Sequence, residues 1–143
     1  MANGITKNRD NASRLANLKP PLVPSSHLDR GMIQLYKQAI DCYVFGQYQA
    51  CCALSRSLVE VLATSFIKKS KFADLLCGKD RDKKRKSIAG ILNDLEIEKP
   101  VISAYCKVVR IADLVLHARK EVLEKECLSV IESVQLIFRQ FPT

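Results

Sequence analysis

Apolar residues recur at spacings of three and four from residue 29 onward, which is the period of an amphipathic helix. The first such run predicts a helix from Asp29 to Gly46, with an acidic residue able to cap its start and a glycine able to end it. Its inward face is expected to carry Met32, Leu35, Tyr36, Ala39, Ile40 and Tyr43. A second helix is predicted from about Gln47 to Lys69. Its buried face is expected to hold Cys51, Leu54, Leu58, Val61, Leu62, Ser65 and Phe66. Because the connection is so short, the two helices should form an antiparallel hairpin.

The second half of the chain repeats the helical period. After a short apolar piece at 72–76, a third helix is predicted over 87–95, with Ile88, Ile91, Leu92 and Leu95 on one side. Pro100 suits the first position of a fourth helix, which should run from about residue 101 to His117. A final helix is predicted over 122–141, with Leu123, Cys127, Val130, Val134, Ile137 and Phe141 facing inward.

Residues 1–28 interrupt this pattern. They contain five asparagine or glycine residues and then Pro20, Pro21 and Pro24, which favour turns over helix. We therefore predict an irregular N-terminal tail over 1–28 and one domain over 29–143. With only five glycines and five prolines in 143 residues, a multi-stranded fold lacks turn residues. The expected fold class is all-α, an up-and-down bundle of four or five helices.

The cysteines suggest reduced core residues rather than a metal or disulfide site. There are six cysteines but no CxxC pair, and the chain has two histidines, so a zinc site would need scattered ligands. We expect no metal and no cofactor. Because the sequence shows no apolar run of about 18 residues and no hydrophobic N-terminal stretch, it predicts a cytoplasmic protein without a membrane span.

Positive charge is concentrated in one segment. The net charge is +8, and residues 79–86 contain six basic and two acidic residues, which is half of the excess. Within it Lys83, Lys84, Arg85 and Lys86 are consecutive. The run is either a solvated loop or a surface that contacts phosphates.

A polar stripe runs along the predicted fourth helix. Arg110 and His117 are two turns apart, with Asp113 between them and Cys106 one turn earlier. Two interpretations stay open. Arg110 and Asp113 could pair within the helix, with His117 hydrogen-bonded to Asp113, and all three would then serve packing only. Alternatively, the stripe is a phosphate site, in which the guanidinium binds the phosphate, the imidazole transfers protons and the carboxylate orients the imidazole.

These residues carry a resemblance to a known family. Arg110 to His117 has the Arg-x6-His form of the HEPN superfamily, and the segment 45–60 looks like the first hairpin of that superfamily, with a Gly-x-Tyr-x-Ala turn followed by Arg56 and Glu60 in an Arg-x3-Glu helix. The similarity covers about 29–141 and is closest to a branch of unknown function in bacterial defence and mobile-element proteins. The chain departs from active relatives at Ile111, where a polar residue, commonly asparagine, usually follows the arginine, and at Asp113, where many relatives have asparagine.

The resemblance implies a helical bundle that forms a homodimer through the motif face. It also implies a cleft in which Arg110 and His117 of both copies cleave RNA without a metal. In this ribonuclease hypothesis Asp113 orients His117, and Lys83 to Lys86 extend the phosphate track. Arg56 and Glu60, one turn apart, could pair on the surface. Relatives sometimes place a polar residue of this helix near the motif, so Arg56 or Glu60 could instead support His117.

Two other functions stay open beside this ribonuclease hypothesis. The bundle could be a non-catalytic module that binds an antitoxin or another defence protein. A weaker hypothesis is a DNA-binding bundle, which rests only on the charge.

Overall fold

A computed structural model describes residues 2–18, 29–77, 87–118 and 121–140. These residues form seven helices and no strand. Four of them make up the central bundle: α2 (Arg30–Val44), α3 (Tyr48–Lys68), α6 (Lys99–His117) and α7 (Glu124–Gln140). The others are α1 (Ala2–Asn17), α4 (Ala73–Cys77) and α5 (Ile88–Asp94). The predicted all-α class is therefore confirmed.

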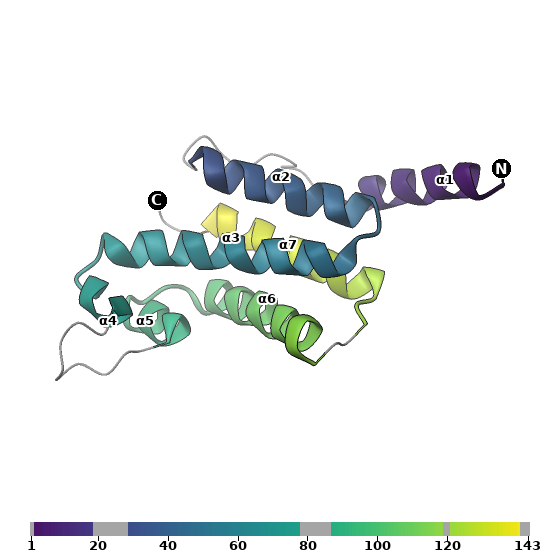
Figure 1. The fold of residues 1–143 in the computed structure, drawn as a ribbon. Coiled ribbons are helices and arrows are strands. Elements are labelled where there is room, and N and C mark those ends of the chain that lie inside the picture. Colours follow the sequence, from purple (N-terminus) through teal and green to yellow (C-terminus); the bar gives the residue numbers. More distant parts are fainter. Residues whose placement is uncertain (1, 19–28, 78–86, 119–120, 141–143) are drawn as a thin grey trace.

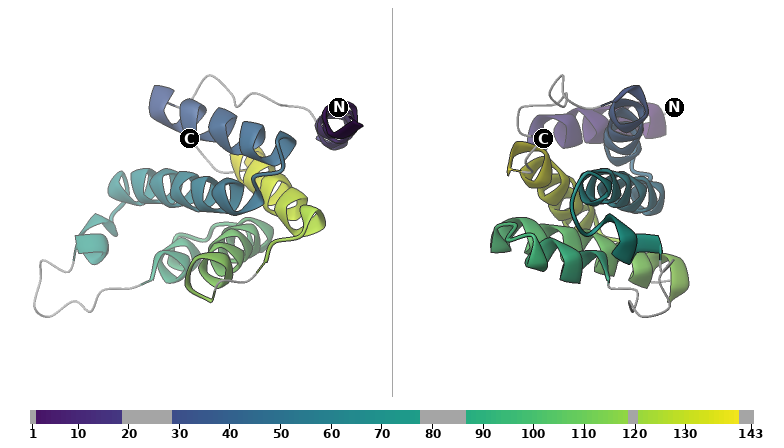
Figure 2. Two further views of the ribbon diagram at one scale, coloured as in Figure 1. Left: turned by 45° about the vertical axis from the view of Figure 1, so that its right-hand side comes forward. Right: turned by 90° about the vertical axis from the view of Figure 1, so that its left-hand side faces the viewer.

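In the bundle formed by α2, α3, α6 and α7, successive helices run in opposite directions (Figure 1). Viewed along the bundle, α2 lies on one side, α3 and α7 lie in the middle, and α6 lies on the other side (Figure 2). The contacts agree with this order, because α3 packs against both α2 and α6, and α7 does the same. The short α4 and α5 lie near the end of the bundle where α6 begins (Figure 1).

Local sequence signals fix the hairpin between α2 and α3. The Asp29 carboxylate accepts a hydrogen bond from the Met32 backbone nitrogen at 2.8 Å, which caps α2 as predicted. Gly46 ends the helix with a φ of +76°, a left-handed conformation that glycine adopts without steric cost. The chain reverses there, and α3 begins two residues later.

The apolar content of α3 follows from its central position. Contrary to the sequence-based expectation, α3 is long and apolar enough to span a membrane by length and composition alone. Its apolar face contacts α2, α6 and α7 within the bundle. Eight of its residues are buried there: Cys51, Cys52, Ser55, Leu58, Val59, Leu62, Ala63 and Ile67.

The predicted inward residues that the structure describes are buried or half-buried, with two exceptions. Val61 is 43% exposed and Leu123 is 61% exposed, so both predictions are wrong. Leu123 precedes α7, which begins at Glu124 rather than Val122, so it does not share the inward face of that helix. The core joins α2 to α7 through an edge-to-face contact between Tyr36 and Phe138, with ring centroids 5.2 Å apart. Phe141 lies outside the described residues.

Helices α5 and α6 begin close to their predicted positions. The Ser87 hydroxyl accepts from the Gly90 backbone nitrogen at 3.1 Å and caps α5. Pro100 lies in the first turn of α6, where its missing N–H leaves no hydrogen bond unmade. Val101 and Tyr105 then anchor this helix in the core.

The N-terminal segment is not an irregular tail throughout. Residues 2–17 form α1, which extends away from the bundle (Figure 1), and this corrects the prediction for 1–28. The prolines that favoured irregular structure begin only at residue 20. Arg14 holds the end of α1 on the hairpin by donating from Nε to the Val44 carbonyl oxygen at 2.8 Å. Leu18, just after the helix, is buried.

Candidate functional site on helix α6

Helix α6 separates an apolar face from the polar stripe. Its inward side is buried and consists of Val101, Ala104, Tyr105, Val108, Ile111, Ala112 and Val115. On the opposite side Cys106, Arg110 and His117 are exposed, and Asp113 is half-buried. The stripe thus faces solvent in the single chain and is not sealed in the core.

Asp113 is linked to α3. Its carboxylate is paired with the Arg56 guanidinium, and Arg56 also donates from Nε to Glu60 Oε1 at 2.9 Å. His117 Nε2 lies 3.8 Å from Asp113 Oδ1. A continuous row of polar groups therefore runs from Glu60 through Arg56 and Asp113 to His117.

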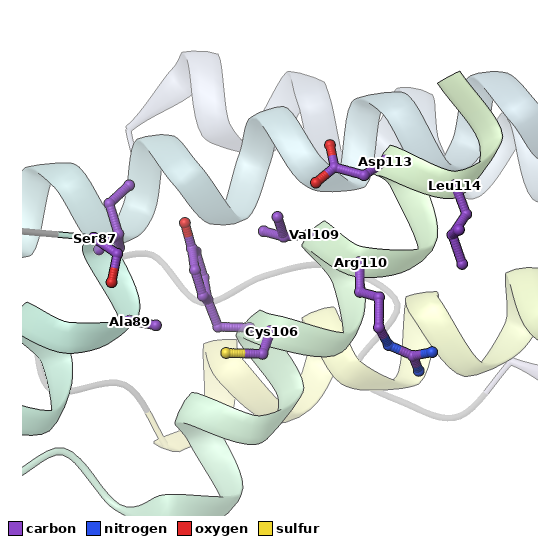
Figure 3. Close-up of a pocket in the computed structure, with 9 residues that line it drawn as sticks. Ser87, Ala89, Cys106, Val109, Arg110, Asp113 and Leu114 are labelled. Atoms are coloured by element: carbon purple, nitrogen blue, oxygen red, sulfur yellow. The ribbon is translucent and has the colours of Figure 1, made fainter. Parts of the chain in front are cut away.

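This row changes the electrostatics that the sequence suggested. The alternative in which Arg110 pairs with Asp113 within the helix is wrong, because the partner of Asp113 is Arg56. The hydrogen bond that Arg56 donates to Glu60, together with the charges of Glu60 and Asp113, raises the pKa of Arg56 above its ordinary value. Arg56 therefore stays charged and offsets the Asp113 carboxylate. Within the described part of the chain, Arg110 has no ion-pair partner, and its guanidinium points away from Asp113 (Figure 3).

A pocket of about 470 Å³ adjoins the stripe where α5 packs against α6. Its lining residues come from the start of α5 and from three turns of α6: Ser87, Ile88, Ala89, Tyr105, Cys106, Val109, Arg110, Asp113 and Leu114. Figure 3 shows Arg110 and Asp113 at one end of this group and Ser87 and Ala89 at the other. His117 does not line the pocket.

The structure brings together five predicted site residues, namely Arg110, Asp113, His117, Arg56 and Glu60. The other four, Lys83, Lys84, Arg85 and Lys86, lie outside the described residues. Sequence reasoning missed the pocket, and with it Ala89 and Val109. Their apolar side chains look like ordinary core positions in a helical pattern, so no local signal marks them.

The cysteines divide into core and surface positions. Cys51, Cys52 and Cys127 are fully buried, as predicted for core residues, and Cys106 is exposed on the stripe. The hydrogen bonds that the Cys127 thiol donates to Cys51 and Cys52, and then its burial, raise the pKa of this thiol, so it stays neutral. No cluster of histidine, cysteine or acidic side chains among the described residues has a geometry that could hold a metal ion.

Comparison with known proteins finds no matching family model and no significant similarity to a curated protein or a solved structure.

Proposed function

We propose that the protein is a metal-independent endoribonuclease of the HEPN type that acts as a homodimer. The proposal rests on the Arg56–Asp113 ion pair. Because Asp113 is paired with Arg56, Arg110 stays unpaired among the described residues, and it is exposed on one face of α6 together with His117. An uncompensated carboxylate beside Arg110 would repel a phosphate. Because Arg56 compensates it, the guanidinium of Arg110 is available for the phosphate.

Arg110, Asp113 and His117 each have a role in this reaction. Arg110 donates two hydrogen bonds to the non-bridging oxygens of the scissile phosphate. The neutral imidazole of His117 accepts the proton of the 2′-hydroxyl, whose oxygen attacks the phosphorus. The bond from phosphorus to the 5′-oxygen breaks, and a protonated histidine of the site donates a proton to that oxygen. The products are a 2′,3′-cyclic phosphate and a 5′-hydroxyl. Asp113 orients His117.

The proposal requires a second copy of the chain. In a single chain the stripe lies on an exposed surface, whereas the reaction needs a base and an acid on opposite sides of the phosphate. Two stripes that face each other would supply both. Leu114, one turn after Arg110 on the same face of α6, is 37% exposed and would lie in such an interface.

The direct test is cleavage of a single-stranded RNA in the presence of a chelator. We expect wild-type protein to cut it, and His117→Ala and Arg110→Ala to lose at least about a hundredfold in rate, as removal of a general base or a phosphate ligand does. Arg139→Ala, at an exposed arginine near the end of α7, is the matched control and should cut normally. Equal cleavage by all four proteins, or by none, would overturn the proposal.

The dimer is tested separately. Leu114→Glu should produce a monomer in analytical ultracentrifugation and should stop cleavage, although Arg110 and His117 are intact. Leu116→Glu is the matched control, because Leu116 is exposed on the same helix but turned away from Arg110. Cleavage by monomeric Leu114→Glu would contradict the shared site.

One observation favours a second candidate function, a non-catalytic module that binds RNA or a protein such as an antitoxin or another defence protein. Ile111 occupies the position after the arginine, and its side chain is buried in the core. It therefore brings no polar group to the site. RNA binding that requires Arg110 without any cleavage would favour this function, and so would a stable complex with a protein encoded by a neighbouring gene.

A further inference from the structure

The pocket between α5 and α6 combines two features that the proposed phosphate site does not explain. Its walls include the side chains of Ala89, Val109 and Leu114, which are apolar. Its other end is formed by Arg110 and Asp113, which are charged (Figure 3). A volume of about 470 Å³ is in the range of pockets that hold small organic groups. A ligand that fits has an apolar body with a polar edge and a negative charge close by.

The cationic side of the pocket indicates that the ligand carries a phosphate. Arg110 lines the pocket and has no ion-pair partner among the described residues. Arg110 therefore supplies a positive charge beside the apolar walls of the pocket. A nucleotide suits this pocket, because its base can contact the apolar walls while its phosphate, one sugar away, reaches Arg110.

Asp113 selects among the bases. Its side chain is 46% exposed, and the described hydrogen bond and ion pairs to it involve Oδ1, so Oδ2 is available as an acceptor. A carboxylate only accepts hydrogen bonds. The Watson–Crick edge of guanine presents two adjacent donors, its ring N–H and its amino group. Uracil presents one donor between two carbonyl oxygens, which a carboxylate repels.

We propose that this pocket binds a guanine base of the RNA whose adjoining phosphate Arg110 holds. The inference rests on the proposed function, and it adds a base preference that the stripe alone does not provide. The base packs against Val109 and Ala89, and its donor edge faces Asp113.

The test uses guanosine 3′-monophosphate, uridine 3′-monophosphate and inorganic phosphate as probes, with binding measured by titration calorimetry. We expect the guanosine nucleotide to bind wild-type protein about tenfold more tightly than the uridine nucleotide, the discrimination typical of a good base contact. Ala89→Leu, which fills the pocket, should abolish this preference. Ala50→Leu is the matched control: it makes the same change at a separate hollow next to the α2–α3 turn and should keep the preference.

Cys106 provides an independent readout, because its exposed thiol lines the pocket. Guanosine 3′-monophosphate should slow alkylation of Cys106, measured by mass spectrometry of its peptide, and the uridine nucleotide should slow it less. This footprint keeps the proposal testable if Ala89→Leu does not fold. Cys106→Leu, at an exposed position, is the second pocket-filling variant.

Equal binding of both nucleotides and phosphate, with no protection of Cys106, would overturn the base pocket. If Arg110 and His117 were still required for RNA cleavage, the proposed function would stand without it. If Ala89→Leu instead changed the oligomeric state and left the nucleotide preference intact, the pocket would be a protein contact and the inference would be wrong.

Discussion

The guanidinium of Arg56 on α3 is paired with the carboxylate of Asp113 on α6, 57 residues further along the chain. The pair joins the first hairpin of the bundle to the helix that carries Arg110 and His117. It also gives the only acid of the stripe a counter-charge. The phosphate chemistry proposed for α6 therefore depends on a residue of another helix.

Removing Arg56 should weaken RNA binding without unfolding the protein. In Arg56→Ala the Asp113 carboxylate is uncompensated beside Arg110, so we expect about tenfold weaker binding in fluorescence anisotropy, or about 1.4 kcal/mol. Because both side chains are partly exposed, the free energy of unfolding should fall by less than about 1 kcal/mol. Arg9→Ala, at an exposed position on α1, should change neither quantity.

A double variant separates charge from packing. Arg56→Ala with Asp113→Asn removes both charges, so RNA binding should return to about the wild-type value. If the double variant binds as weakly as Arg56→Ala, Arg56 acts through packing or through direct contact with RNA, and the compensation argument fails.

The basic run of residues 83–86 should contribute to the salt dependence of RNA binding. Each lysine or arginine that neutralises a phosphate releases counterions, so the logarithm of the binding constant falls with the logarithm of salt concentration. Replacing Lys83, Lys84, Arg85 and Lys86 by glutamine should reduce that slope by about 3 for a single-stranded RNA. An unchanged slope would identify the run as a solvated loop. A DNA duplex tested in parallel would bind comparably if the DNA-binding hypothesis were correct.

Gly46 should tolerate asparagine better than alanine. Its φ of +76° places it in the left-handed region, which costs an L-residue with a Cβ about 1–2 kcal/mol. We expect Gly46→Ala to lose about that much unfolding free energy in urea denaturation and Gly46→Asn to lose less, because asparagine adopts this conformation more readily. The nearest atom to an added Cβ would be Arg14 Nη2, at 3.6 Å, so no clash contributes. Equal losses in the two variants would contradict a backbone origin.

Buried tyrosines should make the protein less stable at alkaline pH. Burial, and then the charge of Glu60, raise the pKa of Tyr105 above its ordinary value, and burial likewise raises that of Tyr36. In the unfolded chain both ionise near pH 10. Above that pH the unfolded state releases protons that the folded state keeps, so stability is complete below about pH 10 and falls as the pH rises.

Tyr105→Phe isolates one of these groups. Urea denaturation at about pH 8 and about pH 11 should show a smaller loss of unfolding free energy for Tyr105→Phe than for wild type, because one ionising group is gone. Identical losses in the two proteins would show that Tyr105 does not contribute to alkaline destabilisation.

Periodicity and capping residues predicted the bundle because these signals are local. Asp29, Gly46 and Ser87 each act within about four residues, and each lies at the expected helix end. The N-terminal helix was missed because what holds it, the bond from Arg14 to the Val44 carbonyl, joins residues 30 positions apart.

The candidate site was likewise predictable where it depends on local sequence signals and not where it depends on contacts between distant residues. Helical spacing placed Arg110, Asp113 and His117 on one stripe, since that relation depends only on the turn of a single helix. Spacing could not identify the partner of Asp113. An arginine at i−3 fits the helical pattern, whereas the actual partner, 57 residues away, lies on another helix that this pattern does not describe. The pocket depends on how α5 packs against α6, which no local pattern encodes.

The separation between Arg56 and Asp113 also bears on when the site comes into existence during synthesis. Arg56 leaves the ribosome well before α6, so a partly made chain holds the compensating cation without the stripe. The arrangement is complete only after α6 has docked on α3. If the protein cleaves RNA, its activity would not begin before the bundle has closed, and a nascent chain would be harmless to the message from which it is translated.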